Sequence, residues 1–211
     1  PSGLTTNMEI VKLLIISTLA SIICGQILRV PFGSGAVTLT DILALLTAIF
    51  YFAQAIYKKQ KIYFPKSYSL AIIVFVLLAS SSTIFALNSY SAADVLRASL
   101  FLIRFCALGA FAIVVSNIYK KSQDGAIYAF LTIGAIFGLI GIVQLVAFSD
   151  LSFLTIYGWD PHQRRIVSSF LDPNFAGFMY TLFFSLSTAL FLFRKKLAYL
   201  VLAGAVFTCI L

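Results

Sequence analysis

Long apolar runs, separated by short polar breaks, set the pattern of this chain. Six runs reach the ~20 mostly apolar residues that a helix needs to cross a bilayer, and a seventh begins near the last residue. We expect transmembrane helices over residues 10–28, 39–57, 68–87, 95–116, 126–148 and 174–193, and a truncated one from Leu197 onward. The pattern therefore predicts an all-α polytopic membrane protein with six transmembrane helices plus a truncated seventh.

The two ends of the chain indicate a segment of a longer protein. A helix that stopped at Leu211 would leave a terminal carboxylate within the hydrocarbon, and Pro1 is not an initiator residue. We expect residues 1–211 to form a single transmembrane domain, the N-terminal part of that longer protein. A signal peptide is the alternative for the first run, but no basic stretch precedes it and no small-residue cleavage site follows Cys24.

Charge supports the membrane class and gives the chain an orientation. The 211 residues are 61% hydrophobic and 10% charged, with a net charge of +8. Basic residues accumulate in short cytoplasmic loops, and here they fall in every second loop. They are Lys58, Lys59, Lys61, Lys66, Lys120, Lys121, Arg194, Lys195 and Lys196. We expect a cytoplasmic N-terminus and an extracytoplasmic loop over residues 149–172.

Two other functional classes have little support in the sequence. Nucleic-acid binding is not expected, because the positive charge lies in short loops beside the apolar runs rather than on one folded face. A metal centre is not expected either, because Cys24, Cys106 and Cys209 are isolated and His162 is the single histidine. We therefore expect no metal and no cofactor.

Arg97 and Arg104 lie in the fourth apolar run, on one helix face because they are seven residues apart. Arg104 falls about 15 Å below the outer end of that helix, half-way through a hydrocarbon core about 30 Å thick. A guanidinium at that depth costs about 3 kcal/mol or more and needs a partner or a wet cavity. Two interpretations stay open. The arginines line an anion site, or Arg97 pairs with Asp94 while Arg104 joins helices through backbone carbonyls.

The extracytoplasmic loop has an apolar first half and a strongly polar second half. Residues 151–159 include Tyr157 and Trp159, which suit a segment lying at the membrane interface. Arg164 and Arg165 follow, and arginine can bind phosphate oxygens through two parallel hydrogen bonds. For Arg164 the simpler interpretation is contact with lipid headgroups, whereas Arg165 adjoins a further motif.

The sixth apolar run begins with Asp172, Pro173 and Asn174, which are a helix start by themselves. Asp is a preferred N-cap that complements the helix dipole, and Pro is preferred at the first helical position. Small residues along a membrane helix allow another helix to pack closely. The sixth and fifth apolar runs both contain such residues: Asn174, Gly177, Thr181, Ser185 and Thr188 in the sixth, and Gly134 and Gly138 in the fifth. Helix packing accounts for these residues without catalysis.

One motif at the start of a mid-chain span consists of Arg165, Ser168 or Ser169, Phe170, Asp172-Pro173-Asn174 and Ala176-Gly177. It resembles the motif of a known family, the O-antigen ligase and polymerase family. The connection from Arg29 to Gly33, leading to Thr38 and Asp41, is similar to that family's N-terminal region. The resemblance covers the first six runs. It implies a GT-C-like helical bundle and a polytopic glycosyltransferase of the bacterial inner membrane.

The resemblance also implies a reaction and a site. Such enzymes transfer a glycan from a polyprenyl diphosphate to an acceptor sugar, either lipid A core or a growing glycan, outside the cytoplasm. The reaction needs cations around the leaving diphosphate and a base for the acceptor hydroxyl. The implied diphosphate contacts are Arg165, Arg104 and Arg97, and the implied site-shaping residues are Asp172, Pro173 and Asn174. The base, a histidine in a later loop, is expected beyond Leu211, so this fragment alone is expected to be inactive.

Two further functions stay open on the sequence. A multi-span transporter or flippase would use Arg97 and Arg104 to line a path for an anionic or lipid-linked substrate. Against it, the sequence has no paired half-helices broken by Gly and Pro. A purely structural membrane subunit would account for the packing glycines but not for Arg104. Glycan transfer by the complete protein would favour the enzyme, and uptake of substrate into vesicles would favour transport.

Overall fold

The computed structural model describes residues 2–32, 35–64, 66–120, 123–157 and 159–207. Five residues named above lie outside these ranges: Pro1, Gly33, Lys121, Cys209 and Leu211. The chain divides into two compact units. The first unit comprises Pro1–Thr18 and Arg29–Gln123, and the second comprises Leu19–Leu28 and Asp124–Leu211. That the chain forms one transmembrane domain stays a prediction.

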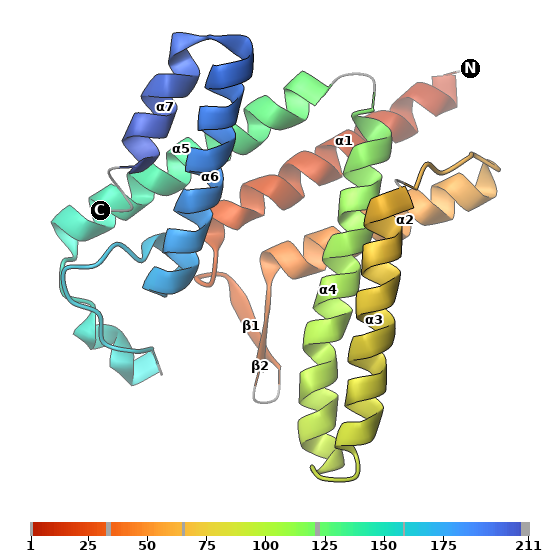
Figure 1. Cartoon of the computed structure of the whole chain (residues 1–211), viewed down its shortest axis with the longest axis horizontal. Helices are drawn as coiled ribbons and strands as arrows, with labels where there is room; N and C mark the ends of the chain where they lie inside the picture. The colour runs from red at the N-terminus through yellow and green to blue at the C-terminus, as the bar shows by residue number, and fades with distance from the viewer. Residues whose placement is uncertain (1, 33–34, 65, 121–122, 158, 208–211) are drawn as a thin grey trace. The chain divides into compact units, whose positions relative to one another are not determined.

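Five helices within the described residues are long and apolar enough to cross a membrane. They are α2 (Leu39–Tyr57), α3 (Lys66–Ala86), α4 (Ala92–Ile118), α5 (Gln123–Ala147) and α6 (Pro173–Arg194) (Figure 1). They correspond to the second to sixth predicted spans, and α2 has the predicted bounds. The short helix α7 (Leu197–Phe207) covers the described part of the seventh. The chain is therefore a mostly helical, multi-pass membrane protein.

The first predicted span, residues 10–28, differs from the structure. The helix α1 (Ser2–Ser21) starts earlier and ends sooner. A 3₁₀ turn, η1 (Ile22–Cys24), and a bend at Gly25 follow it. Gly25 has φ +50°, a left-handed conformation that stops a helix. Residues 25–28 are therefore not helical, and because α1 is not among the five apolar helices, a count of six spans is not confirmed.

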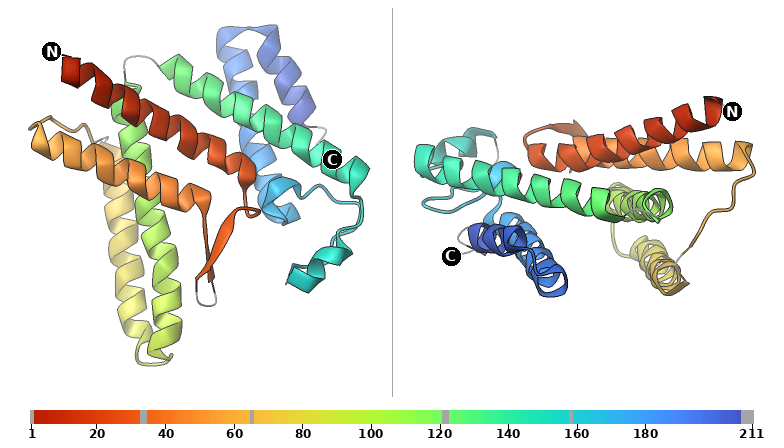
Figure 2. Two further views of the ribbon diagram at one scale, coloured as in Figure 1. Left: turned by 180° about the vertical axis from the view of Figure 1, so that it is seen from behind. Right: turned by 90° about the horizontal axis from the view of Figure 1, so that it is seen from above.

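A β-hairpin precedes α2, which the all-α prediction lacked. Strands β1 (Arg29–Phe32) and β2 (Gly35–Thr38) pair antiparallel, with Arg29 opposite Thr38. The second strand ends at the N-cap of α2, and the left view of Figure 2 shows the hairpin leading into this helix. The Thr38 hydroxyl accepts a hydrogen bond from the Asp41 N–H, and the Asp41 carboxylate accepts one from the Thr38 N–H. This reciprocal cap fixes the first turn of α2 and terminates the hairpin.

In the first unit, α2 and α3 both pack against α4. The rings of Phe75 and Phe105 lie 4.4 Å apart between α3 and α4. On the other side of α2, the hydroxyls of Thr18 and Thr47 lie 3.1 Å apart and join α1 to α2. Both threonines are almost fully buried, so this hydroxyl pair provides polar contact between helices where no water competes.

In the second unit, the core lies between α5 and α6 and contains Phe137, Tyr180 and Phe183, each at most 1% exposed. A Cβ at Gly134 would lie 2.5 Å from the Phe183 ring, so the close helix packing predicted at Gly134 is confirmed. At Gly177 the prediction is wrong for the described residues, because a Cβ there would meet no atom within 4 Å. No described atom packs against the small-residue face of α6 at Gly177.

Gly25→Ala is expected to destabilise the second unit. The added Cβ would lie 2.5 Å from the backbone oxygen of Ser169, and a left-handed conformation alone costs an L-residue roughly 1–2 kcal/mol. We expect a lower melting temperature for the detergent-solubilised protein. Gly177→Ala is the matched control, and its stability should be unchanged or raised because the site is open and alanine favours helix. Equal melting temperatures for both variants would show that the Gly25 contact is not needed.

Candidate functional site

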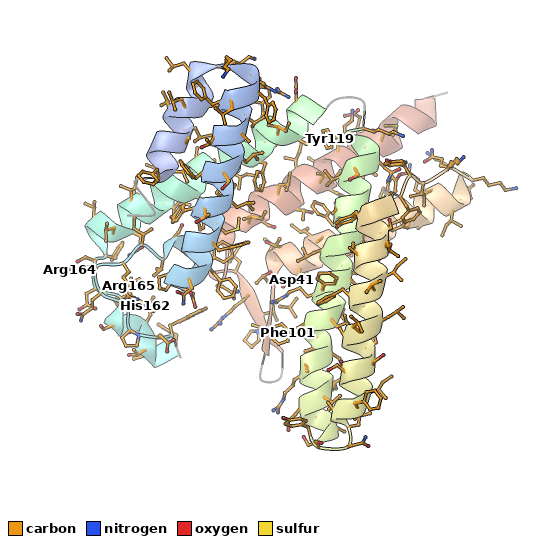
Figure 3. The ribbon with its side chains drawn as sticks, in the orientation of Figure 1. Asp41, Phe101, Tyr119, His162, Arg164 and Arg165 are labelled. Carbon is orange, nitrogen blue, oxygen red and sulfur yellow. The ribbon has the colours of Figure 1, made fainter. Side chains whose placement is uncertain are left out.

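The predicted extracytoplasmic loop folds back on itself between α5 and α6. Asp150 and Gln163 form an antiparallel bridge. The Leu151 N–H donates to the His162 carbonyl at 2.9 Å, and the Arg164 N–H donates to the Ser149 carbonyl at 2.7 Å. These bonds return the polar half of the loop to the end of α5. Figure 3 shows His162, Arg164 and Arg165 close together on this part of the chain.

The Asp150 carboxylate joins the first and second halves of the loop through hydrogen bonds. One oxygen accepts a hydrogen bond from the Ser152 N–H at 2.8 Å, and the other accepts one from the Gln163 amide at 3.2 Å. The Ser152 hydroxyl, then the Ser152 N–H, lower the pKa of this carboxyl below its ordinary value. The Asp150 carboxyl is ionised at neutral pH even at its ordinary pKa, and the lowered pKa keeps both oxygens available as acceptors in more acidic solution as well. The turn leads into the 3₁₀ helix η2 (Ser152–Tyr157).

Left-handed backbone conformations are concentrated in the segment from Arg164 to Leu171. Arg164, Ser168 and Leu171 have φ of 54°, 49° and 56°. Within the described residues only two other non-glycine residues, Lys59 and Lys195, have positive φ, and both follow helix C-termini, where this conformation is common. Non-glycine residues in this region store strain, and such strain clusters at functional sites. The segment is therefore a candidate for function by its backbone as well as by its side chains.

Gln144 of α5 fixes the backbone around Arg165. Its amide nitrogen donates to the Arg165 carbonyl at 3.3 Å, and its amide oxygen accepts from the Val167 N–H at 3.0 Å. The Ser168 hydroxyl donates to the Phe137 carbonyl at 3.0 Å, within the buried core of the second unit. Among the described residues, no hydrogen bond or ion pair engages the exposed Arg165 guanidinium. Arg165 is thus an unpaired cation on an anchored backbone.

Asp172 caps α6, as the sequence predicts. One carboxylate oxygen accepts hydrogen bonds from the N–H groups of Asn174 at 2.7 Å and Phe175 at 3.2 Å. Pro173 takes the first helical position. The cap neutralises the positive end of the helix, so α6 itself does not offer a free anion site. The site-shaping role of Asp172, Pro173 and Asn174 stays a prediction.

The two arginines of α4 have aspartate partners. Arg97 donates to Asp94 at 3.0 Å in a pair whose side chains are about half exposed, which confirms that interpretation. Arg104 donates through Nη2 to the Asp41 carboxylate at 2.7 Å and to the Ala36 carbonyl at 3.0 Å. The expected contact with a backbone carbonyl is therefore present. In addition, Arg104 connects α4 to the head of α2 and to the hairpin.

The sequence analysis did not predict the Arg104–Asp41 pair, although the position of one acidic and one basic residue within apolar runs indicated it. Asp41 is the only charged residue of the second apolar run, and Arg104 is a deep cation in the fourth. Opposite charges within apolar runs tend to pair, because neither is stable alone in hydrocarbon. The side chains are 33% and 14% exposed. Figure 3 shows Asp41 and Phe101 near each other beside α4, and the Arg104 guanidinium lies 6.0 Å from the Phe101 ring centre.

The predicted diphosphate contacts belong to different units. Arg97 and Arg104 lie in the first, and Arg165 lies in the second with Asp172, Pro173 and Asn174. The structure brings Arg165 and the cap of α6 into one segment, whereas a site built from all three arginines stays a prediction. Cys24 and Cys106 are free thiols, and no cluster of three His, Cys, Asp or Glu side chains occurs in the described ranges.

An impermeant label should reach the loop between α5 and α6 from outside intact cells. We propose single-cysteine variants at Thr155, which is exposed in η2, and at Lys120, at the end of α4, with Cys24, Cys106 and Cys209 replaced by serine. The alternation of basic loops predicts labelling at position 155 and none at 120 until the membrane is opened. The reverse pattern would overturn the orientation and move Arg165 to the cytoplasmic face.

Known proteins do not assign a family to the chain. None of the family models, curated proteins or solved structures compared with it matches. A functional proposal therefore depends on the loop and on the arginines themselves.

Proposed function

We propose that the chain belongs to a membrane glycosyltransferase that transfers or polymerises a polyprenyl-diphosphate-linked glycan on the extracytoplasmic face of the bacterial inner membrane. The observation that carries the proposal is the exposed, unpaired Arg165 on a backbone anchored to α5 by Gln144. The resemblance of the segment from Arg165 to Gly177 to the O-antigen ligase and polymerase motif supports the same reaction.

The proposed reaction needs a positively charged side chain at the depth of the lipid phosphates. The bond between the sugar carbon and the diphosphate oxygen breaks, and the electron pair stays on the leaving diphosphate. The acceptor hydroxyl oxygen bonds to that carbon and gives its proton to a base. A guanidinium can hold two diphosphate oxygens, and its stabilisation grows as the negative charge develops. Gln144 fixes the backbone of Arg165, so only the exposed side chain has to turn toward the diphosphate.

Apolar side chains in the same loop suit a lipid-linked donor. Phe153, Ile156 and Tyr157 of η2 are 54%, 77% and 67% exposed. Aromatic and aliphatic groups of this kind lie at the boundary between headgroups and acyl chains. On this proposal they hold the loop at the interface, so that Arg165 meets the diphosphate while the prenyl tail stays in the membrane. Arg104 and Arg97 are proposed as further diphosphate contacts, with membrane lipids around them.

Transport of an anionic or lipid-linked substrate is the second candidate. It would depend on Arg97 and Arg104, each of which is paired with an aspartate that weakens its attraction for an anion, whereas glycan transfer depends first on Arg165, which has no such partner among the described residues. We therefore consider a transporter or flippase the second candidate function and a glycosyltransferase the first.

The leaflet in which the lipid-linked glycan accumulates separates the two functions. Cells that lack the intact gene are converted to spheroplasts and treated with an impermeant glycosidase. A glycosyltransferase acting outside the cytoplasm leaves its donor in the outer leaflet, so the glycan should be cleaved. Loss of a flippase traps the donor inside, so protection from cleavage would contradict our proposal and support transport. Restoring the intact gene should remove the accumulation in either case.

A further inference from the structure

The connection between α2 and α3 carries a cluster of lysines with no nearby acid in the sequence. Lys58, Lys59 and Lys61 lie in it, and Lys120 follows the end of α4. The chain has no acidic residue between Asp41 and Asp94. In the described part of this unit, none of these four lysines forms a salt bridge. The cluster is therefore a concentrated positive charge at one end of three apolar helices.

Asn117 folds this connection against the end of α4. Its side-chain oxygen accepts from the Tyr63 N–H at 2.8 Å, and its side-chain nitrogen donates to the Tyr63 carbonyl at 2.9 Å. The Lys120 ammonium lies 4.0 Å from the centre of the Tyr63 ring. At the other end, the Gln60 N–H donates to the Ala55 carbonyl at 2.8 Å and continues the α2 terminus. Lysines from two elements are thus held on one ordered surface.

Lys58 gives more direct evidence of a ligand than the exposed lysines do. Its ammonium nitrogen is buried and has no hydrogen-bond partner among the described residues. A charged group enclosed without a partner is costly, and it is stabilised when an anion reaches it. The lysine side chain is long, so a rotation of its methylene groups can bring the ammonium to a bound anion at the surface.

We propose that Lys58, with Lys59, Lys61 and Lys120 around it, binds the phosphate of an anionic lipid headgroup. The neighbouring side chains favour a lipid over a soluble anion, because Ile56, Tyr57 and Phe64 are 75%, 87% and 48% exposed. Such apolar groups contact acyl chains, while lysines beside a membrane helix bind anionic headgroups. The inference does not depend on glycan transfer, and the site is distinct from the loop that carries Arg165.

Lipid binding can be measured on the purified protein by native mass spectrometry in detergent. Phosphatidylglycerol is titrated against phosphatidylcholine, with inorganic phosphate as the soluble comparison. We expect preferential, saturable binding of phosphatidylglycerol. Lys58→Gln should weaken it roughly tenfold, the effect of losing one hydrogen bond to a charged group. Lys195→Gln removes the same charge from an exposed site after α6 and should leave the affinity unchanged.

Three results would overturn the proposal. They are equal affinity for the two lipids, an unchanged affinity in Lys58→Gln, or competition by inorganic phosphate at concentrations comparable to those of the lipid. If Lys58→Gln fails to fold, Lys120→Gln serves instead, because that side chain is exposed and lies over the Tyr63 ring. For Lys120→Gln too, weakened binding of phosphatidylglycerol supports the site, and unchanged binding contradicts it.

Discussion

Arg165→Ala is expected to lower glycan transfer by about 100-fold or more, while the protein still inserts into the membrane. Removing one hydrogen-bond donor to developing negative charge typically costs a factor of about 100 to 1,000 in rate. Arg165 is exposed and its side chain has no partner in the described residues, so its loss should leave the fold intact. The measurement is the rate of transfer from a lipid-linked donor in membranes that contain matched amounts of each variant, expressed from the intact gene.

Arg164→Ala is the control for this experiment. Arg164 is the adjacent residue, carries the same charge and is also exposed, but we assign it to lipid headgroups. Its replacement should change the rate by only a few-fold, on the scale of a weak exposed charge contact. If both variants lose transfer equally, the general charge of the loop matters rather than the position of Arg165. If neither loses it, Arg165 has no part in the reaction.

Arg104→Ala is expected to lower the free energy of unfolding by about 3 kcal/mol, because the pair is part-buried and only the lower end of the range for breaking a buried ion pair applies. The change leaves the Asp41 carboxylate without its strongest partner at 14% exposure, and it removes the bond from α4 to the Ala36 carbonyl. The effect should be seen in thermal unfolding of the detergent-solubilised protein. It should also appear as faster proteolysis of the hairpin region, because Arg104 connects β2 to α4.

Arg97→Ala is the matched change on the same helix face. Its pair with Asp94 is 55% and 53% exposed, so we expect a loss of no more than about 1 kcal/mol. Combining Arg104→Ala with Asp41→Asn, which keeps an acceptor for the cap of α2, should be less destabilising than the sum of the single changes. Additive losses would show that Arg104 and Asp41 do not act as a pair.

The parts of the fold that sequence predicted well are those with local signals. The bounds of α2 follow from Thr38 and Asp41, which form a reciprocal cap, and from the lysines that begin at Lys58. The start of α6 follows from Asp172 and Pro173. In these places a few adjacent residues decide where a helix begins or ends, so the linear pattern is sufficient.

The parts that sequence did not predict depend on residues far apart in the chain. α1 ends before Gly25, whose left-handed backbone lies against the carbonyl of Ser169 and whose neighbour Gln26 donates to that carbonyl at 2.9 Å. An apolar run over residues 10–28 gives no sign of this. The arginines illustrate the same limit, because depth in the membrane indicated that Arg104 needs a partner but did not identify Asp41.

The anchoring of the candidate site is also nonlocal. Arg165 is visible in the sequence as a cation next to a helix start, but its backbone is fixed by Gln144, which lies in the preceding helix and has no special pattern around it. Arg164, Ser168 and Leu171 have left-handed conformations in the same segment. None of these residues is a glycine, so composition gives no indication of strain.

Direct binding of a short-chain polyprenyl diphosphate to the purified protein tests the central claim, that Arg165 holds a lipid diphosphate. Affinity is measured for the unchanged protein, Arg165→Ala and Arg164→Ala in nanodiscs of neutral lipid, which removes competition from anionic headgroups. We predict saturable binding that Arg165→Ala weakens by roughly tenfold or more and that Arg164→Ala leaves nearly unchanged. Equal affinity of all three proteins, or no saturable binding to any of them, would contradict the claim.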